Sequence, residues 1–259
     1  MDKMQESIRK MVCELASILN GQVHSVWLYG SAVMDDFHPG WSDIDFLALS
    51  AGPITQTQAD RLLTLRQTLS EAYPDDPYYA CFEGVILPLQ AYLNREDCRA
   101  VYWGTSGQRI LSHWEPDAFA AFELSRYGKS VYGEADRSIF ACPDRAALVA
   151  AVRRHYDSIR RYAVETGESL YSCGWLLDIA RCVCTLRSGT VIAKTRAGEQ
   201  ALAERLFPDE AELEKTLKIR KNPMKYKEDP ETRAWLSGLG PVVQRCADVL
   251  EKELEKERL

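Results

Sequence analysis

The chain has 259 residues, of which 46% are hydrophobic and 27% charged, and its formal net charge is −6. This composition is typical of a globular protein and excludes a disordered chain. No apolar run is as long as a membrane span, and the amphipathic, acid-containing start does not resemble a secretory signal, so we expect a cytoplasmic protein without a membrane partner. The net acidity makes nucleic acid an unlikely partner and suits a cationic one.

The first half of the chain alternates predicted helices and strands. An apolar stripe predicts a helix, β-branched and aromatic residues predict two strands, and a third strand is expected in a longer apolar stretch. The helices cover residues 4–19 and 56–72, and the strands cover 23–29, 44–49 and part of 78–89. This alternation predicts an α/β (α+β) domain with a mixed sheet. We assign residues 1–130 to it.

The second half is predicted to be helical throughout. Apolar residues recur at helical spacing, and Gly, Pro or Asp separate the segments. The predicted helices are 116–130, 144–166, 169–187, 195–206, 209–219 and 230–256. Segments of this kind form bundles of antiparallel neighbours. Residues 131–259 are therefore expected to form a C-terminal helical domain.

One short stretch carries the residues best suited to chemistry. Gly30 and Ser31 follow the first predicted strand, and Asp43 and Asp45 come after a spacer of eleven residues. A glycine at a strand end lets the backbone turn sharply and approach a phosphate, and a helix starting there would favour an anion. Two aspartates two residues apart on a strand point to one face, where two hard oxygen ligands suit Mg²⁺ that is also bound by substrate phosphates.

An ordinary structural explanation exists for each half of this pattern. A Gly-Ser pair at a strand end is common turn chemistry, and Asp-x-Asp is common in surface loops. Here the carboxylates lie within an apolar strand, where unpaired charges are costly. The combination therefore favours a functional site over two unrelated structural features.

The stretch LYGSAVMDDFHPGWSDIDFLALS (28–50) resembles the signature of the polymerase-β-like nucleotidyltransferase superfamily. The whole chain, with its helical second half, resembles the streptomycin/spectinomycin group of aminoglycoside adenylyltransferases. This resemblance implies transfer of AMP from ATP, with Mg²⁺ as cofactor, to a small cationic, hydroxylated acceptor. It implies antibiotic resistance as a role.

Glu83 is the candidate for the third carboxylate of such enzymes. It is the only charged residue in the apolar segment 79–87, and burial there would make its carboxylate a stronger base for an alcohol. The similar position in the family carries the catalytic base. A Glu at a strand edge paired with an arginine, or a further metal ligand, are the alternatives.

In the second half, residues 175–194 resemble the family segment in which an arginine and a lysine contact the nucleotide phosphates. Those positions fall on Arg181 and Lys194. Arg can clamp phosphate oxygens with two hydrogen bonds, and Lys acts as a point charge. Salt bridges on a helix surface are the competing explanation. Tyr226, in NPMKYKEDP, resembles a tyrosine that lies near the nucleotide in the family.

One position departs from the family pattern and bears on the acceptor. Streptomycin-using relatives carry an acidic residue ten positions before the helix arginine, where this chain has Tyr171. Spectinomycin is therefore favoured over streptomycin as acceptor. The alternatives are a nucleotidyltransferase that acts on a protein or tRNA, and a nucleotide-binding module without catalysis.

Overall fold

The protein forms two compact units in a computed structural model that describes residues 2–105 and 107–257. Unit 1 contains the residues up to Val33 together with Ser42–Ala141, and unit 2 contains Met34–Trp41 together with the residues from Cys142 onward. Over the described part of the chain, no helix combines the length and the apolar character needed to cross a bilayer.

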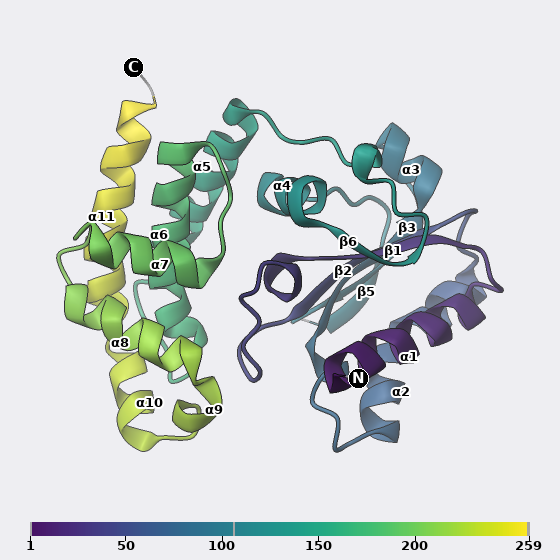
Figure 1. The fold of residues 1–259 in the computed structure, drawn as a ribbon, viewed down its shortest axis with the longest axis horizontal. Helices are drawn as coiled ribbons and strands as arrows, with labels where there is room; N and C mark the ends of the chain where they lie inside the picture. Colours follow the sequence, from purple (N-terminus) through teal and green to yellow (C-terminus); the bar gives the residue numbers. More distant parts are fainter. Residues whose placement is uncertain (1, 106, 258–259) are drawn as a thin grey trace. The chain divides into compact units, whose positions relative to one another are not determined.

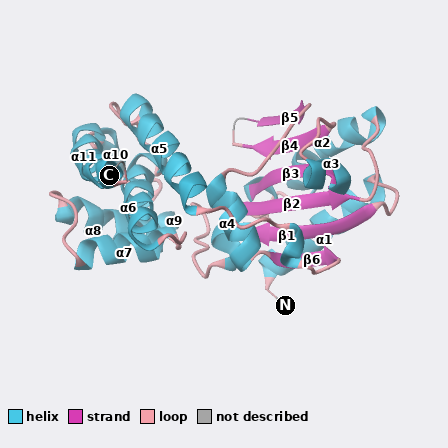
Figure 2. Ribbon diagram, turned by 90° about the horizontal axis from the view of Figure 1, so that it is seen from above, coloured by secondary structure: helices cyan, strands magenta, loops and turns pink. Residues whose placement is uncertain are grey.

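Unit 1 is built on a sheet with strand order β5-β4-β3-β2-β1-β6 (Figure 2). The strands β2 and β3 are parallel, whereas all other neighbours are antiparallel. The predicted mixed sheet is thus confirmed. The strands are β1 (Val23–Tyr29), β2 (Ile44–Ser50), β3 (Phe82–Pro88), β4 (Ala100–Gly104), β5 (Gly107–Leu111) and β6 (Lys129–Gly133).

Helices cover both faces of this sheet (Figure 1). The helices α1 (Lys3–Ile18) and α2 (Gln56–Ala72) lie on one face, and α3 (Leu89–Asn94) and α4 (Ala118–Tyr127) lie on the other. Short 3₁₀ turns complete the unit at η1 (Gly30–Val33), η2 (Tyr79–Cys81) and η3 (Arg137–Ile139). The start of α2 follows its sequence closely, because Thr55 and Gln58 form a capping box.

The alternation of β2 places its side chains in two separate cores. Phe46 packs edge-on against Trp103, whose indole donates a hydrogen bond to the Leu62 carbonyl of α2. Leu47 and Leu49 belong instead to the cluster on the opposite face, which includes Trp27 and Phe140. Because successive side chains point to opposite faces, Asp45 shares the face of Leu47 and Leu49.

The end of unit 1 differs from the sequence prediction. The predicted helix 116–130 stops at Tyr127, and the residues after Gly128 form β6, which pairs with β1. The expected division between residues 130 and 131 therefore falls inside a strand of the sheet, and the packed unit continues to Ala141. The assignment of the two halves as separate domains stays a prediction.

Unit 2 is a helical bundle, as predicted. Its helices are α5 (Arg145–Tyr162), α6 (Tyr171–Ser188), α7 (Lys194–Ala203), α8 (Glu210–Lys221), α9 (Pro223–Tyr226), α10 (Pro230–Ser237) and α11 (Gly240–Lys256). The helix α6 is central, since it contacts α5, α7, α8, α10 and α11 and is buried almost all round. The single helix predicted for 230–256 is interrupted at Gly238 and Leu239, because Pro241 has no N–H and is tolerated only in a first turn.

Candidate active site

A row of polar side chains crosses the central strands of unit 1. Tyr29 of β1 pairs with Asp45 of β2, and Asp45 in turn pairs with Glu83 of β3. Side chains that are paired across neighbouring strands point to the same face. The sequence-predicted carboxylates Asp45 and Glu83 are therefore brought side by side, each of them half-buried. The parallel register that joins them was not predicted from the sequence.

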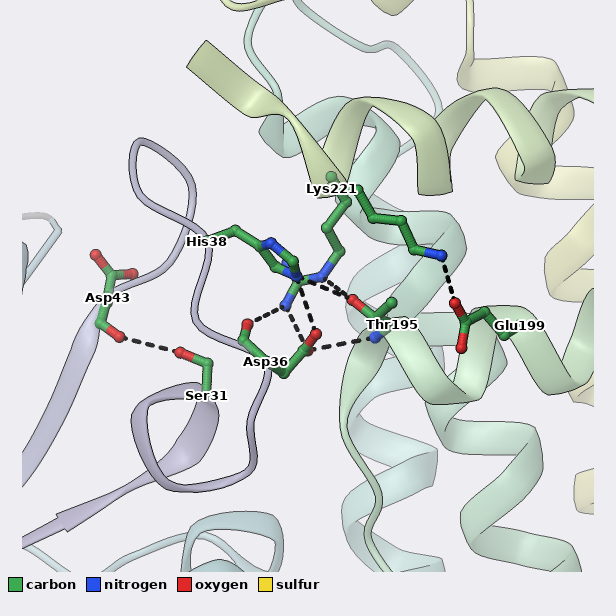
Figure 3. A network of polar contacts seen from close by, with 8 residues as sticks. Ser31, Asp36, His38, Asp43, Thr195, Glu199 and Lys221 are labelled. Atoms are coloured by element: carbon green, nitrogen blue, oxygen red, sulfur yellow. Dashed lines mark hydrogen bonds and ion pairs between the residues drawn. The ribbon is translucent and has the colours of Figure 1, made fainter. Parts of the chain in front are cut away.

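The second aspartate, Asp43, directly precedes β2 rather than lying within it. The residues that flank Asp45, Ile44 and Phe46, are fully buried on the opposite face, as expected. The Ser31 hydroxyl donates a hydrogen bond to the Asp43 carbonyl oxygen at 3.2 Å (Figure 3). This bond ties the Gly-Ser part of the motif to the Asp-x-Asp part.

The sharp turn predicted at Gly30 is present, since its φ is +65°. A Cβ atom at this position would lie 2.2 Å from Oδ2 of Asp45. Because Gly30 has no Cβ, the Asp45 carboxylate can occupy this space. The sequence did not indicate that Gly30 makes room for Asp45. The helix expected after Gly30 is only the 3₁₀ turn η1.

The charges around this row are strongly negative. Burial raises the pKa of Tyr29 well above its usual value, and the nearby charges of Asp45, Glu123, Asp117 and Glu83 raise it further. Asp117 caps the start of α4, and Glu123 lies within that helix. Four carboxylates from three elements therefore act on one phenol, which favours a cation at this place.

Glu83 is held by a tyrosine. The Tyr102 hydroxyl donates a hydrogen bond to Oε1 of Glu83 at 3.0 Å. Burial and the Glu83 charge raise the pKa of Tyr102, so the phenol keeps the proton that it donates. The Arg109 guanidinium lies over the Tyr102 ring, 4.6 Å from its centroid. Arg109 thus stacks on the tyrosine that holds Glu83.

The donor set of unit 1 fits a hard divalent cation. Among residues 2–105 and 107–257, no group of three or more His, Cys, Asp or Glu residues is arranged to hold a metal ion. Asp45 places a carboxylate oxygen directly beside Gly30, in the space that the missing Cβ leaves, and Asp43 supplies a second carboxylate two residues earlier in the chain. Two carboxylates suit Mg²⁺, which keeps further positions for water and substrate phosphates.

In unit 2, the two predicted phosphate-binding cations meet at one carboxylate. Nζ of Lys194 lies 2.8 Å from Oδ1 of Asp178, and Nη2 of Arg181 lies 3.7 Å from the same oxygen. Burial acts to raise the pKa of Asp178, but the charges of Lys194 and Arg181 outweigh it and lower that pKa. Both cations therefore form ion pairs, but with a carboxylate that is only 16% exposed and not on the helix surface, where the sequence analysis considered such pairs.

The other residue predicted to bind the nucleotide, Tyr226, ends the short helix α9, which packs on α8. Its ring is half-buried, and the Lys225 ammonium lies 5.5 Å from the ring centroid. The roles assigned to Tyr226, Arg181 and Lys194 stay predictions, as do those of Gly30, Ser31, Asp43, Asp45 and Glu83.

The loop between the two parts of the motif belongs to unit 2 and carries a polar network that the sequence did not reveal (Figure 3). Oδ2 of Asp36 accepts a hydrogen bond from Arg220 at 2.6 Å and one from the backbone N–H of Thr195 at 3.3 Å. Nε2 of His38 lies 3.2 Å from Oδ1 of Asp36. The sequence signals for this network were the aspartates and His38 inside the spacer of the motif.

Comparison with known proteins supports the assignment of the fold. Residues 6–82 match the family model of the nucleotidyltransferase domain. A search of curated proteins gave no significant match. The spectinomycin adenyltransferase AAD(9) from Enterococcus faecialis, solved with ATP and spectinomycin, is 16% identical, with a TM-score of 0.63 over 93% of this chain and 97% of that chain.

A second solved structure, a toxin-antitoxin with AMP-PNP, is 15% identical and covers 57% of this chain and 90% of that chain, with a TM-score of 0.29. The first structure and the matched domain agree with the motif, the mixed sheet and the helical second half. The resemblance found in the sequence is confirmed at the level of domain and fold: residues 6–82 match a nucleotidyltransferase domain, and the fold of the chain is similar to that of the spectinomycin adenyltransferase.

Proposed function

We propose that the protein transfers AMP from ATP to a hydroxyl of an aminoglycoside or aminocyclitol antibiotic, with release of pyrophosphate. The observation that carries the proposal is the pairing of Asp45 with Glu83 beside the turn at Gly30. This pairing sets a candidate metal ligand next to a candidate base, which is the arrangement that attack of an alcohol on a phosphate requires. Resistance to the modified drug would follow.

Asp43 and Asp45 would hold Mg²⁺ together with the triphosphate of ATP. The metal, when bound, neutralises charge on the phosphate oxygens and on the departing pyrophosphate. Gly30 and Ser31 would bring backbone N–H groups to the triphosphate, and Arg181 and Lys194 would bind its oxygens. Tyr226 would lie near the nucleotide.

Glu83 would act as the general base. The acceptor hydroxyl gives its proton to the Glu83 carboxylate while its oxygen forms a bond to the α-phosphorus, and the bond from that phosphorus to pyrophosphate breaks. The hydrogen bond from Tyr102 to Oε1 fixes the orientation of the carboxylate before the reaction. The surrounding carboxylates suit an acceptor that carries ammonium groups.

The preference for spectinomycin over streptomycin rests on Tyr171. Its side chain is at the start of α6 and is 68% exposed, in edge-on contact with Trp175 at 5.1 Å between ring centroids. Asp178, the acidic residue two turns further along α6, is committed to Lys194 and Arg181. Asp178 therefore does not replace the acidic group that streptomycin-using relatives carry at the position of Tyr171.

The proposal is tested by pyrophosphate release from the purified chain with Mg²⁺ and ATP. The acceptors are spectinomycin, streptomycin, kanamycin and a lincosamide, and mass spectrometry checks each for added AMP. Asp43→Asn should abolish turnover. The matched control is Asp35→Asn, an exposed carboxylate of the same loop at φ +53°, a conformation that Asn tolerates.

Turnover on spectinomycin alone supports the whole proposal. Turnover on streptomycin as well would contradict the argument from Tyr171. ATP binding without turnover on any of the four drugs would contradict the proposed acceptor and favour a macromolecule such as a protein or tRNA. Equal activity of Asp43→Asn and the unchanged chain would contradict the proposed metal site.

A further inference from the structure

Asp178 is a carboxylate at the meeting point of two helices in unit 2. It lies on α6, and its side chain is 16% exposed. Lys194 is the first residue of α7, and Arg181 lies one turn beyond Asp178 on α6. The distances of 2.8 Å to Lys194 and 3.7 Å to Arg181 converge on one oxygen atom, Oδ1.

Two residues in the first turn of α7, Lys194 and Thr195, each contact a carboxylate. The N-cap residue, Ala193, has no side chain that could accept a hydrogen bond from the first turn. The Thr195 N–H instead donates to Asp36, and Lys194 is paired with Asp178. The exposed N–H groups of a helix start carry partial positive charge, which a cation at the first position increases. The first turn of α7 therefore binds two carboxylates, those of Asp36 and Asp178.

We infer that Asp178 is a positioning residue for the nucleotide. It holds the side chains of Lys194 and Arg181 in one arrangement before ATP arrives, so that the two cations meet the phosphate oxygens without reordering. The inference rests on the proposed function, because it assumes that these two cations bind the triphosphate.

The charge balance of the cluster agrees with such a role. Asp178 opposes the like charges of Lys194 and Arg181, so the two cations can lie near one another and still attract a phosphate. A lysine ammonium has three donors, so its ion pair with one carboxylate oxygen leaves Lys194 able to bind a phosphate oxygen as well. Lys194 is 31% exposed in its side chain, and without Asp178 its long stem would be free to adopt other rotamers.

A double-mutant cycle tests the inference. Asp178→Asn should lower kcat by roughly tenfold or more, since small misplacements of a binding group are costly for phosphoryl transfer. Lys194→Gln should lower it at least as much. The loss of kcat in the double variant should be smaller than the product of the two single losses, because both changes remove the ion pair between Asp178 and Lys194. Asp178→Glu, which keeps the charge, should recover part of the loss.

Glu253→Gln is the matched control. Glu253 is another carboxylate of unit 2 with little exposure, and it bridges Arg187 and Lys256, which have no place in the proposed site. This variant should keep the kcat of the unchanged chain. Multiplying effects in the double variant, a kcat of Asp178→Asn within twofold of the unchanged chain, or an equal loss in Glu253→Gln would each overturn the inference.

Calorimetric binding of Mg-ATP separates this inference from the proposed function. If the unchanged chain binds ATP but modifies none of the drugs, the proposed acceptor is wrong. The role of Asp178 can still be tested, because the Kd for Mg-ATP can be measured for the two single variants and the double variant. Non-additive effects of the two substitutions on the Kd are then the expected result, and additive effects overturn the inference. If the unchanged chain binds no ATP, the proposed function fails and the inference fails with it.

Discussion

Asp36 and Arg220 form a buried ion pair, in which Nη2 of Arg220 lies 2.6 Å from Oδ2 of Asp36. The two side chains are only 5% and 3% exposed. Arg220 also donates through Nε to the Thr195 hydroxyl, which fixes its orientation. The pair fastens the loop Met34–Trp41 to the helices of unit 2, and this loop is the spacer between Ser31 and Asp43.

Removing one partner of this pair should destabilise the protein strongly. Asp36→Asn leaves the Arg220 charge buried without its counter-ion, and we expect a loss of about 3 to 5 kcal/mol in the free energy of unfolding. Urea denaturation measures this loss. Asp36→Asn combined with Arg220→Met should lose less than Asp36→Asn alone, because the buried charge is also removed.

An exposed ion pair of the same unit supplies the comparison. Arg245 and Asp209 lie 2.7 Å apart but are 50% and 20% exposed. Asp209→Asn should cost no more than about 1 kcal/mol, since solvent screens such pairs. Equal losses for Asp36→Asn and Asp209→Asn would contradict the importance that we assign to the buried pair.

The Asp36 pair should also make stability depend on pH. Burial acts to raise the pKa of Asp36, but the Arg220 charge and the hydrogen bonds from Thr195 and Arg220 bring it below its usual value of 3.8. The folded state therefore binds the Asp36 proton less readily than the unfolded state does. This contribution to stability is complete above the unfolded pKa and is lost as the pH falls through the folded one.

Urea denaturation between pH 6 and the acid limit of folding checks this expectation. The difference in the free energy of unfolding between the unchanged chain and Asp36→Asn should be constant at the upper end of the range. It should narrow once the pH falls below about 4, where the unfolded carboxyl begins to be protonated. A difference that grows towards acid pH would refute the assigned direction of the pKa shift.

Gly30→Ala should inactivate the proposed enzyme by displacing Asp45. The new Cβ would lie 2.2 Å from Oδ2 of Asp45, so the carboxylate has to move. We expect at least a tenfold loss of turnover, and positive φ adds about 1 to 2 kcal/mol of destabilisation. Pyrophosphate release and thermal unfolding are the measurements.

Gly21 provides the matched control for this substitution. Its φ is +75°, close to that of Gly30, but a Cβ there would meet no atom within 4 Å. Gly21→Ala should therefore show similar backbone strain with full turnover. If both variants lose turnover equally, strain rather than the displaced carboxylate is responsible.

Glu83→Gln should lower kcat by about 10²- to 10⁴-fold, the usual contribution of a general base, while the Kd for ATP stays within a few fold. Tyr102→Phe removes the hydrogen bond to Oε1 but keeps the carboxylate, so its loss should be smaller. Glu71→Gln, on the exposed end of α2, should keep the kcat of the unchanged chain. A Glu83→Gln variant that loses ATP binding rather than kcat would favour Glu83 as a metal ligand.

The sequence predicted those elements whose signals are local. The helix α2 and the strand β1 have the predicted bounds, because a capping box and a run of β-branched and aromatic residues define them. The strands β4, β5 and β6 were missed, since each has five residues and is stabilised by pairing with a neighbour. A strand that depends on its partner has little periodicity of its own.

In the candidate site, too, residues close in sequence were predicted, whereas contacts between residues far apart in sequence were not. Gly30, Ser31, Asp43 and Asp45 stand out because their spacing is visible in one short segment. The pairing of Asp45 with Glu83, and of Asp36 with Arg220, depends on the register of a parallel pair and on helix packing. Contacts between residues so far apart in sequence leave no periodic pattern that a single chain could reveal.

The place of β6 in the sheet has a consequence for synthesis. The strand β1 needs β6 on one side, where Leu28 pairs with Lys129. A ribosome that adds roughly 5–20 residues per second releases β6 some seconds after β1, and until then that edge of β1 is open. The open edge carries Val26, Trp27 and Leu28, all buried in the finished fold. Expression yield should therefore respond to chaperones that cover unpaired strands in nascent chains.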